Sequence, residues 1–373
     1  MKTFDHTSSL DFLLVLPADI PSAPYVEYYT RIMQNEKRTW KIITWHRNND
    51  HSNLYQNNEL PFPLVCNNSI SKVRKFFLYT KFSTFISRKI RIFRPRVILF
   101  FTLELPIITL LTYRIDRHTY FLDIRDRSDV LNSFFPFLRD WVINKSKACF
   151  ISSKSFCKWL PPQKNYCYSP NISSFFLREH KKTARDRINY PRKVLFMGQV
   201  RYYEITYQFI KSLPTDSFVI DFVGTFLSNE NHFKALPHIF PNVNLLGKYQ
   251  KDSEIEIASQ YDFIAILLPG KSKDNMTNRF YTALTSGVPI IANEGSMAAS
   301  YIQKYPPIGV VIPDDMNQVS IYLKDYICGF SSDDFAFSRE EVLKEVEKEI
   351  SHFEDSFHHL ISHYLPKVPS LTD

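Results

Sequence analysis

The chain has 373 residues, of which 44% are hydrophobic and 23% are charged, a composition typical of a globular protein rather than a disordered or fibrous one. No apolar run approaches the roughly 20 residues that span a bilayer, so we expect no integral membrane protein. The 46 Lys and Arg residues exceed the 38 Asp and Glu residues by a net charge of +8. This charge favours an anionic partner such as nucleotide phosphate, anionic lipid or nucleic acid.

The amino-terminal segment and the cysteines bear on location. Asp5 and Asp11 precede the short apolar run at 12–16, and no small-residue cleavage site follows it, so we interpret that run as a strand rather than a secretion signal. The five cysteines are scattered without CxxC or zinc spacing, which predicts reduced thiols, no disulfide and no metal site. We therefore expect a cytoplasmic protein.

Short β-rich runs alternate with longer helix-like stretches along the chain, a pattern that predicts parallel α/β sheets. The expected strands cover 12–16, 41–45, 97–101, 120–123 and 148–151, and then 193–197, 218–223, 243–245, 263–268, 289–292 and 310–312. Because 373 residues exceed what one core usually organises, we predict two doubly wound domains, at 1–180 and 190–338. A polar, charged connection closed by Pro191 lies between them.

The last segment, 339–364, has apolar residues close to helical spacing, which predicts a long terminal helix that we expect to join the first domain. His359 and His363 on it are four residues apart, a spacing that suits paired metal ligands. No carboxylate stands at ligand spacing from them, so exposed helix histidines are the favoured interpretation.

The stretch 72–96 is basic and aromatic and contains no acidic residue. Its apolar residues are near helical spacing, which leaves two interpretations open. One is an amphipathic helix at an anionic membrane surface, and the other is a domain helix with an aromatic face in the core and a solvated basic face. Nucleic-acid binding is disfavoured, because no recognisable nucleic-acid motif accompanies the charge.

The run 263–296 indicates a strand, a loop, a helix, a tight turn and a further strand. Gly287 suits the end of that helix and Pro289 the start of the next strand. In α/β sheets, anions bind where a helix begins beyond the carboxyl end of a strand. Asn275, Asn278 and Arg279 stand at that helix start, and two amides with a guanidinium could take up a diphosphate.

The sequence NRFYTALTSGVPIIA at 278–292 resembles the donor-binding segment of GT-B glycosyltransferases, where the helix reads roughly NKLYEALASGKPIIA. It is most similar to family 4 and its relatives in bacterial capsular and O-antigen polysaccharide assembly. VLFMGQVRYYE and DFVGTF resemble the first two strands of the donor domain, and LLVLPADIPSAPYVEYYTRIM and TYFLDIRDRSD resemble passages of the acceptor domain. The resemblance implies the GT-B architecture, in which two Rossmann-like domains face a cleft.

The resemblance also implies roles for particular residues. The donor nucleotide would be bound by Gly198, Arg201, Gly224, Asn275, Asn278, Arg279 and Thr282. The acceptor side would include Asp19, Tyr25, Asp123, Arg125 and Asp126. Family 4 usually carries two glutamates, one contacting the donor sugar and one the ribose, and Asp274 and Thr282 stand at those places. Glu104 stands where many members have a histidine, so Asp274 and Glu104 are the candidate catalytic residues.

Structural roles remain open for the same side chains. Arg201 and Arg279 would then be surface residues, Asp274 a helix N-cap, and Glu104 an ordinary loop residue. Asp123, Arg125 and Asp126 would form an ion-paired strand end.

The resemblance implies transfer of a sugar from a nucleotide-sugar donor to a growing cell-surface polysaccharide or a lipid-linked oligosaccharide. Such an enzyme, a hexosyltransferase-like member of EC 2.4, would stabilise the leaving nucleoside diphosphate. We expect it to retain the anomeric configuration and to need no metal or other cofactor, because no convincing DxD motif ends a strand. We expect it in the cytoplasm, at the inner face of the plasma membrane if 72–96 binds lipid. The alternatives are a GT-B-fold nucleotide-sugar epimerase and a non-catalytic subunit that kept the fold.

Overall fold

The computed structural model describes residues 10–46, 57–66, 71–127, 131–132, 135–162, 164–172 and 190–366. Contacts divide the chain into two compact units. Unit 1 comprises the chain up to Pro170 together with the residues from Glu349 onward, and unit 2 comprises Asn171–Lys348. Most of the expected connection, at 173–189, lies outside the described residues.

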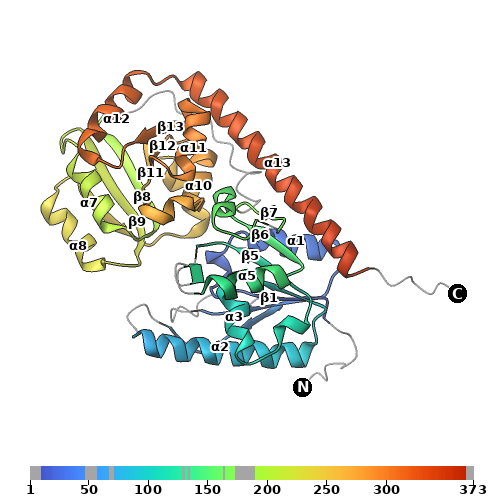
Figure 1. Ribbon diagram of the computed structural model, residues 1–373. Coiled ribbons are helices and arrows are strands. Elements are labelled where there is room, and N and C mark those ends of the chain that lie inside the picture. The colour runs from blue at the N-terminus through green and yellow to red at the C-terminus, as the bar shows by residue number, and fades with distance from the viewer. Residues whose placement is uncertain are drawn as a thin grey trace. The chain divides into compact units, whose positions relative to one another are not determined.

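Unit 1 is built on a seven-stranded sheet of order β3-β2-β1-β4-β5-β6-β7 in which the paired strands are parallel (Figure 1). Its strands are β1 Phe12–Val15, β2 Trp40–Thr44, β3 Glu59–Pro61, β4 Val97–Phe100, β5 Tyr120–Ile124, β6 Ala148–Ile151 and β7 Cys167–Tyr168. Its helices are α1 Val26–Asn35, α2 Lys72–Phe93, α3 Glu104–Leu110 and α5 Pro136–Lys145.

Unit 2 is built on a six-stranded parallel sheet of order β10-β9-β8-β11-β12-β13. Its strands are β8 Arg192–Val200, β9 Phe218–Phe226, β10 Val243–Gly247, β11 Phe263–Ile266, β12 Ile290–Asn293 and β13 Gly309–Ile312. Its helices are α7 Tyr203–Lys211, α8 Glu230–Ile239, α9 Glu254–Ala258, α10 Asn278–Ser286, α11 Met297–Lys304 and α12 Val319–Cys328.

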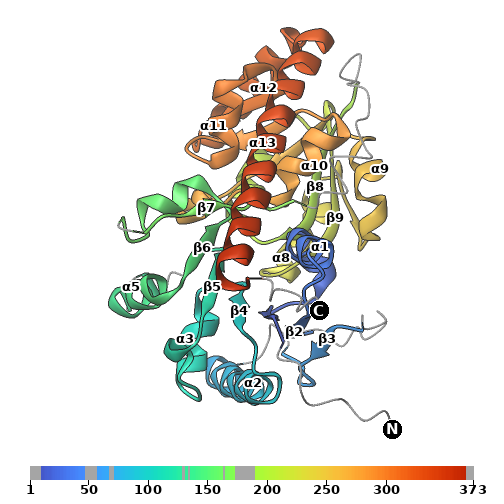
Figure 2. The same cartoon turned by 90° about the vertical axis from the view of Figure 1, so that its right-hand side faces the viewer.

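The last helix, α13 Ser332–Tyr364, contributes to both units, because the division falls between Lys348 and Glu349 (Figure 2). It begins at Ser332 rather than at 339, where the sequence placed its start. None of the helices in the described ranges combines the length and apolar character needed to cross a bilayer.

The central strands of both sheets are buried on both faces, as in most parallel sheets. In unit 1, Leu13 and Val15 of β1 face a core cluster with Phe82 of α2. Phe12 of the same strand faces the other way and contacts Phe357 of α13 at 5.9 Å between ring centroids. The structure thus confirms the predicted α/β fold of two parallel sheets with a long C-terminal helix.

Each sheet has one point where the strand order reverses. From β1 the chain builds outward through β2 and β3 and then returns to β4, and from β8 it builds through β9 and β10 and returns to β11. Loops that leave neighbouring strands at such a point run to opposite sides and leave space for a ligand beyond the carboxyl ends. A ligand site in unit 2 is therefore expected beyond the carboxyl ends of β8 and β11.

Candidate functional site

Two glycines shape the carboxyl end of β8. Gly198 has a φ of +81° and lies opposite Gly224 of β9, whose φ is +143°. A Cβ atom on Gly224 would lie 2.0 Å from the carbonyl oxygen of Gly198, closer than any side chain allows. The two strands meet here through bare backbone. The sequence predicted that the first strand of the second domain ends at 197, whereas β8 continues to Val200.

The loop after β11 is held from two sides. The Asn293 side chain, at the end of β12, donates to the carbonyl of Leu268 and accepts from its N–H, both at 2.9 Å. The Tyr202 hydroxyl, just beyond β8, donates to Ser272 Oγ at 2.9 Å. Ser272 belongs to the short 3-10 helix Gly270–Asp274, so this loop is tied to the segment that follows β8. Sequence analysis assigned no role to these residues.

The helix α10 begins after this loop at Asn278, within the predicted range. Thr277 precedes it in an extended conformation, and Gly287 ends it with a φ of +70°. The amide oxygen of Asn278 and the hydroxyl of Thr277 are buried and have no hydrogen-bond partner within the described ranges. Because buried polar atoms are nearly always paired, the start of α10 has hydrogen-bonding capacity available for a ligand. Asp274 and Asn275 lie at the end of the preceding 3-10 helix and are half-buried.

Arg279 joins α10 to β8. Its Nη2 donates to the carbonyl oxygen of Gln199 at 2.7 Å. Burial, and after it the like charge of Arg201, lower the pKa of Arg279 to about 10. Arg201 is exposed, and its Nη2 lies 3.4 Å from Gln199 Oε1. Two guanidinium groups near one strand end repel each other, and an anion that binds between them relieves that repulsion.

A buried carboxylate, Glu254, lies behind α10. The Thr282 hydroxyl donates to Glu254 Oε1 at 2.5 Å. The Tyr249 hydroxyl donates to Oε2 at 3.1 Å, and Lys251 forms an ion pair with the same oxygen. Glu254 was not predicted from the sequence. It belongs to the five-residue helix α9 and stands 28 positions before Thr282 in the chain, so no local spacing relates the two. A carboxylate is thus present beside Thr282, where the resemblance had led us to expect one.

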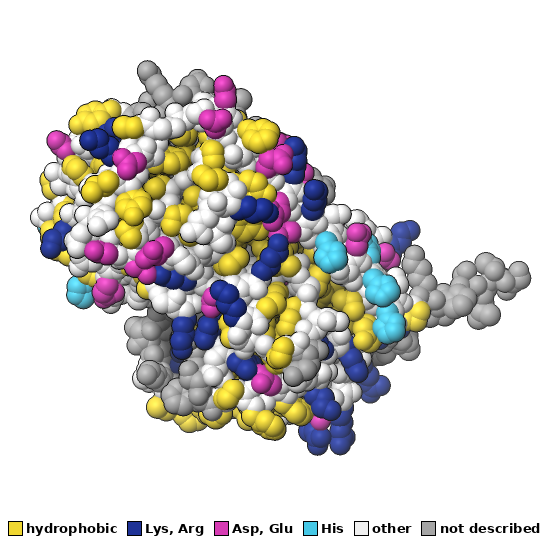
Figure 3. Space-filling view, turned by 45° about the horizontal axis from the view of Figure 1, so that its top comes forward, with side chains coloured by type: hydrophobic (Ala, Val, Ile, Leu, Met, Phe, Trp, Pro, Cys, Tyr) yellow, Lys and Arg dark blue, Asp and Glu magenta, His cyan; other side chains and the backbone are white. Residues whose placement is uncertain are grey.

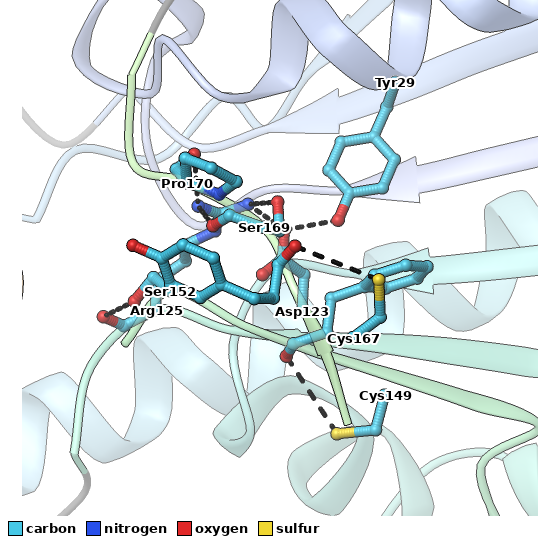
Figure 4. A network of polar contacts seen from close by, with 10 residues as sticks. Tyr29, Asp123, Arg125, Cys149, Ser152, Cys167, Ser169 and Pro170 are labelled. Atoms are coloured by element: carbon cyan, nitrogen blue, oxygen red, sulfur yellow. Dashed lines mark hydrogen bonds and ion pairs between the residues drawn. The ribbon is translucent and has the colours of Figure 1, made fainter. Parts of the chain in front are cut away.

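In unit 1, Asp123 and Arg125 form a buried ion pair at the end of β5 (Figure 4). Tyr29 donates to Asp123 at 2.7 Å, and Arg125 donates to Ser169 Oγ at 2.7 Å and to the Ser169 carbonyl at 3.1 Å. Burial raises the pKa of Asp123, and Arg125 acts in the opposite direction. The pair therefore joins β5 to the segment after β7, which favours the ion-paired strand end over a ligand contact.

Of the other candidates in unit 1, Tyr25 contacts this ion pair, and Asp19, Asp126 and Glu104 are described by their place in the fold. Tyr25 lies beside the ion pair, because the Arg125 guanidinium stacks on its ring at 3.7 Å from the centroid. Asp19 follows β1 and precedes a short 3-10 helix, and Asp126 is exposed beyond β5. Glu104 is the first residue of α3 rather than a loop residue, and it is half-buried. Asp19 and Glu104 thus follow the two strands at which the order of this sheet reverses.

The described ranges contain no group of three or more His, Cys, Asp or Glu side chains arranged to hold a metal ion. The cationic and amide groups near Arg279, by contrast, are suited to a phosphate-bearing ligand.

The two parallel sheets, their strand orders and the shared terminal helix define the GT-B fold. Solved structures agree over nearly the whole chain. A sucrose-phosphate synthase from Thermosynechococcus elongatus matches with a TM-score of 0.70 and 10% identity, covering 95% of this chain and 100% of that one. HepE from Anabaena, crystallised with UDP-glucose, matches with a TM-score of 0.65 and 11% identity, covering 94% and 99%.

A UDP-N-acetylglucosamine 2-epimerase from Rickettsia bellii also matches, with a TM-score of 0.59 and 10% identity over 96% of this chain and 99% of that one. At these identities the likeness establishes the fold. No family model matches the sequence, and no curated protein does.

Proposed function

We propose that the chain is a glycosyltransferase that takes a sugar from a nucleoside diphosphate sugar bound in unit 2. The observation that carries this proposal is the position of Arg279. It lies at the start of α10 and donates a hydrogen bond to the end of β8. The positive charge of Arg201 is near enough to lower the pKa of Arg279. The structural neighbour crystallised with UDP-glucose makes a uridine diphosphate sugar the first donor to test.

In this proposal each side of the site binds a different part of the donor. Arg279, Arg201 and the N–H groups at the start of α10 bind the diphosphate and stabilise the charge that develops on it as the sugar leaves. Gly198 and Gly224 let the nucleotide approach the backbone of β8 and β9. Asn275 and Asn278 contribute amide contacts.

The nucleoside and the sugar occupy the two flanks of the diphosphate. Glu254 and Thr282 together bind the ribose hydroxyls. A ribose hydroxyl donates a stronger hydrogen bond to the Glu254 carboxylate than to the neutral Thr282 hydroxyl. Asp274 accepts hydrogen bonds from hydroxyls of the donor sugar. The reaction retains the anomeric configuration and proceeds without a metal ion, because Arg279 and helix N–H groups take up the charge.

The acceptor belongs to unit 1 in this proposal. Asp19, Tyr25 and Glu104 lie near the carboxyl ends of β1 and β4, where the order of that sheet reverses. Glu104 is half-buried at the start of α3 and can orient an acceptor hydroxyl or take its proton. The acceptor is a growing polysaccharide or a lipid-linked oligosaccharide, and the enzyme works in the cytoplasm.

The second candidate is a nucleotide-sugar epimerase, which the match to an epimerase of the same fold favours. Incubation with UDP-sugars separates the two. A transferase passes the sugar to an added glycan and releases nucleoside diphosphate, whereas an epimerase interconverts the free donor with no acceptor present.

The donor site is tested by calorimetric titration of UDP into wild-type protein and the Arg279→Ala variant. We expect Arg279→Ala to weaken UDP binding about tenfold to a hundredfold, because charge-assisted hydrogen bonds are lost. Its melting temperature should stay close to that of wild type, because loss of the hydrogen bond to Gln199 is offset by removal of a guanidinium that is costly to bury. Lys234→Ala, on the exposed face of α8, is the matched control. Equal UDP affinity in Arg279→Ala and wild type would contradict the assignment.

A further inference from the structure

The helix α2 is held on unit 1 by one face. Phe82, Ile86 and Ile90 are buried in the core of the unit, and Ser83 donates to the carbonyl of Ile108 in α3 at 2.9 Å. This packing determines which side of α2 points away from the core.

The outward face of α2 combines basic and apolar side chains. Arg74, Phe77, Lys81, Thr84, Arg88, Arg91 and Ile92 are all exposed. The first six recur at steps of three or four residues and Ile92 follows Arg88 by four, which places all seven on one side of an α-helix. A solvated helix face normally carries mixed charge, whereas this one is basic and apolar.

Its apolar residues are unusually exposed. Val73, Phe76 and Phe77 at the start of α2 expose 68%, 61% and 62% of their surface, and Ile92 at the other end exposes 51%. The rings of Phe76 and Phe77 contact each other with centroids 6.3 Å apart. Contiguous apolar surface left in water marks a binding surface.

The positive charge of α2 has little local compensation. No acidic residue occurs between Glu59 and Glu104 in the sequence. Burial lowers the pKa of Lys89, and the like charges of Arg88 and Lys41 lower it further. Figure 1 draws α2 on the outer side of the sheet of unit 1, and Figure 3 shows hydrophobic side chains and Lys or Arg side chains along the bottom of its view. An anionic partner therefore gains from every basic residue on this face.

We propose that the outward face of α2 docks on an anionic lipid surface. Val73 and Phe77 insert among the lipid chains at one end of the helix and Ile92 at the other, while Arg74, Lys81 and Arg88 contact headgroup phosphates. Apolar side chains that enter the lipid interface and basic side chains that attract anionic headgroups both favour binding of this face to a membrane. Lipid fits better than nucleic acid, because aliphatic side chains at both ends gain nothing from a phosphodiester backbone.

The test is cosedimentation of the full-length protein with vesicles of phosphatidylglycerol and phosphatidylcholine in equal parts, compared with vesicles of phosphatidylcholine alone. Wild-type protein should bind the mixed vesicles, and binding should fall as salt rises. Arg74→Ser, Lys81→Ser and Arg88→Ser together should weaken binding about a hundredfold, at roughly fivefold for each basic residue. Val73→Ser with Phe77→Ser should also weaken it at least tenfold.

The matched controls change exposed residues of unit 2. Lys211→Ser, Lys234→Ser and Lys324→Ser remove the same charge, and Ile321→Ser with Tyr322→Ser removes an exposed apolar pair on α12. Both should bind vesicles like wild type, and melting temperatures should confirm that every variant is folded.

Two outcomes would overturn the proposal. The first is wild-type binding that is no stronger to the mixed vesicles than to phosphatidylcholine alone. The second is binding that free inorganic phosphate or a single-stranded oligonucleotide abolishes and that Val73→Ser with Phe77→Ser leaves unchanged, which would indicate an anion site rather than a lipid surface. The assay uses neither nucleotide nor acceptor, so its failure leaves the proposed transferase function untouched.

Discussion

At the scale of single residues, Thr282 and Glu254 show how a carboxylate from one element can lie beside a position of another element that itself carries none. The resemblance to family 4 places a glutamate at position 282, and this chain has threonine there. Glu254 hydrogen-bonds to the Thr282 hydroxyl at 2.5 Å from the neighbouring helix α9. A buried carboxylate without a charged ligand or partner is unfavourable, and here Lys251 and Tyr249 stabilise it.

If Glu254 accepts a hydrogen bond from the ribose, Glu254→Gln should reduce UDP affinity roughly fivefold to tenfold, because a neutral acceptor forms a weaker bond. The preference for UDP over 2′-deoxy-UDP should shrink by a similar factor. Both ligands are titrated calorimetrically, with Glu256→Gln, an exposed residue of the same helix, as control. An equal loss for the two ligands would show that Glu254 does not bind the 2′-hydroxyl.

At the scale of elements, the pairing of β8 with β9 depends on close backbone approach. Gly224→Ala introduces a Cβ 2.0 Å from the Gly198 carbonyl oxygen at a φ of +143°, so the two strand ends must separate. We expect a large drop in melting temperature and weaker UDP binding. Gly247→Ala is the control, because its φ is also positive, at +79°, but nothing lies within 4 Å of the added Cβ. Its cost is therefore that of the backbone alone, about 1–2 kcal/mol.

A second prediction at this scale concerns the end of β5. Asp123→Ala leaves the buried Arg125 guanidinium without its carboxylate, which should lower the free energy of unfolding by about 3–5 kcal/mol. Asp116→Ala removes a carboxylate from an exposed pair with Arg114 and should change stability little. Denaturant titration followed by circular dichroism measures both. Equal stability of the two variants would refute the structural role of Asp123.

At the scale of the whole molecule, the second half of α13 completes unit 1. Phe353 and Phe357 contact the ring of Tyr29, each at 5.0 Å between centroids, and also contact Phe150 of β6. This face of the sheet would otherwise be open to water. The first half of α13 serves unit 2, where the Arg339 guanidinium donates to the carbonyls of Leu284 and Thr285 near the end of α10.

Because Phe357 is fully buried, Phe357→Ala should lower the free energy of unfolding by about 3–5 kcal/mol. Phe337→Ala changes a residue of the same helix that is 71% exposed, and its effect should stay within about 0.5 kcal/mol. Thermal unfolding of both variants compares them directly. A similar effect of the two substitutions would mean that α13 does not cover the sheet of unit 1.

Local sequence patterns were enough to predict the two parallel sheets and the start and end of α10. These features depend on short-range signals, namely alternation of apolar runs with helix-like stretches, and Gly287 at a position that requires positive φ. The edge strands β3 and β7 were not predicted, because three and two residues are too few to show a period.

Contacts between groups that are distant in the chain became known only from the folded structure. It placed Glu254 against Thr282, Gly198 opposite Gly224, and Arg125 against Ser169, because packing of separate elements is not encoded in local spacing. It also divided the aromatic residues of α2, with Phe82 in the core and Phe76 and Phe77 in solvent. The sequence predicted the helix and its charge, but only its packing on the sheet defined which face remained available to a partner.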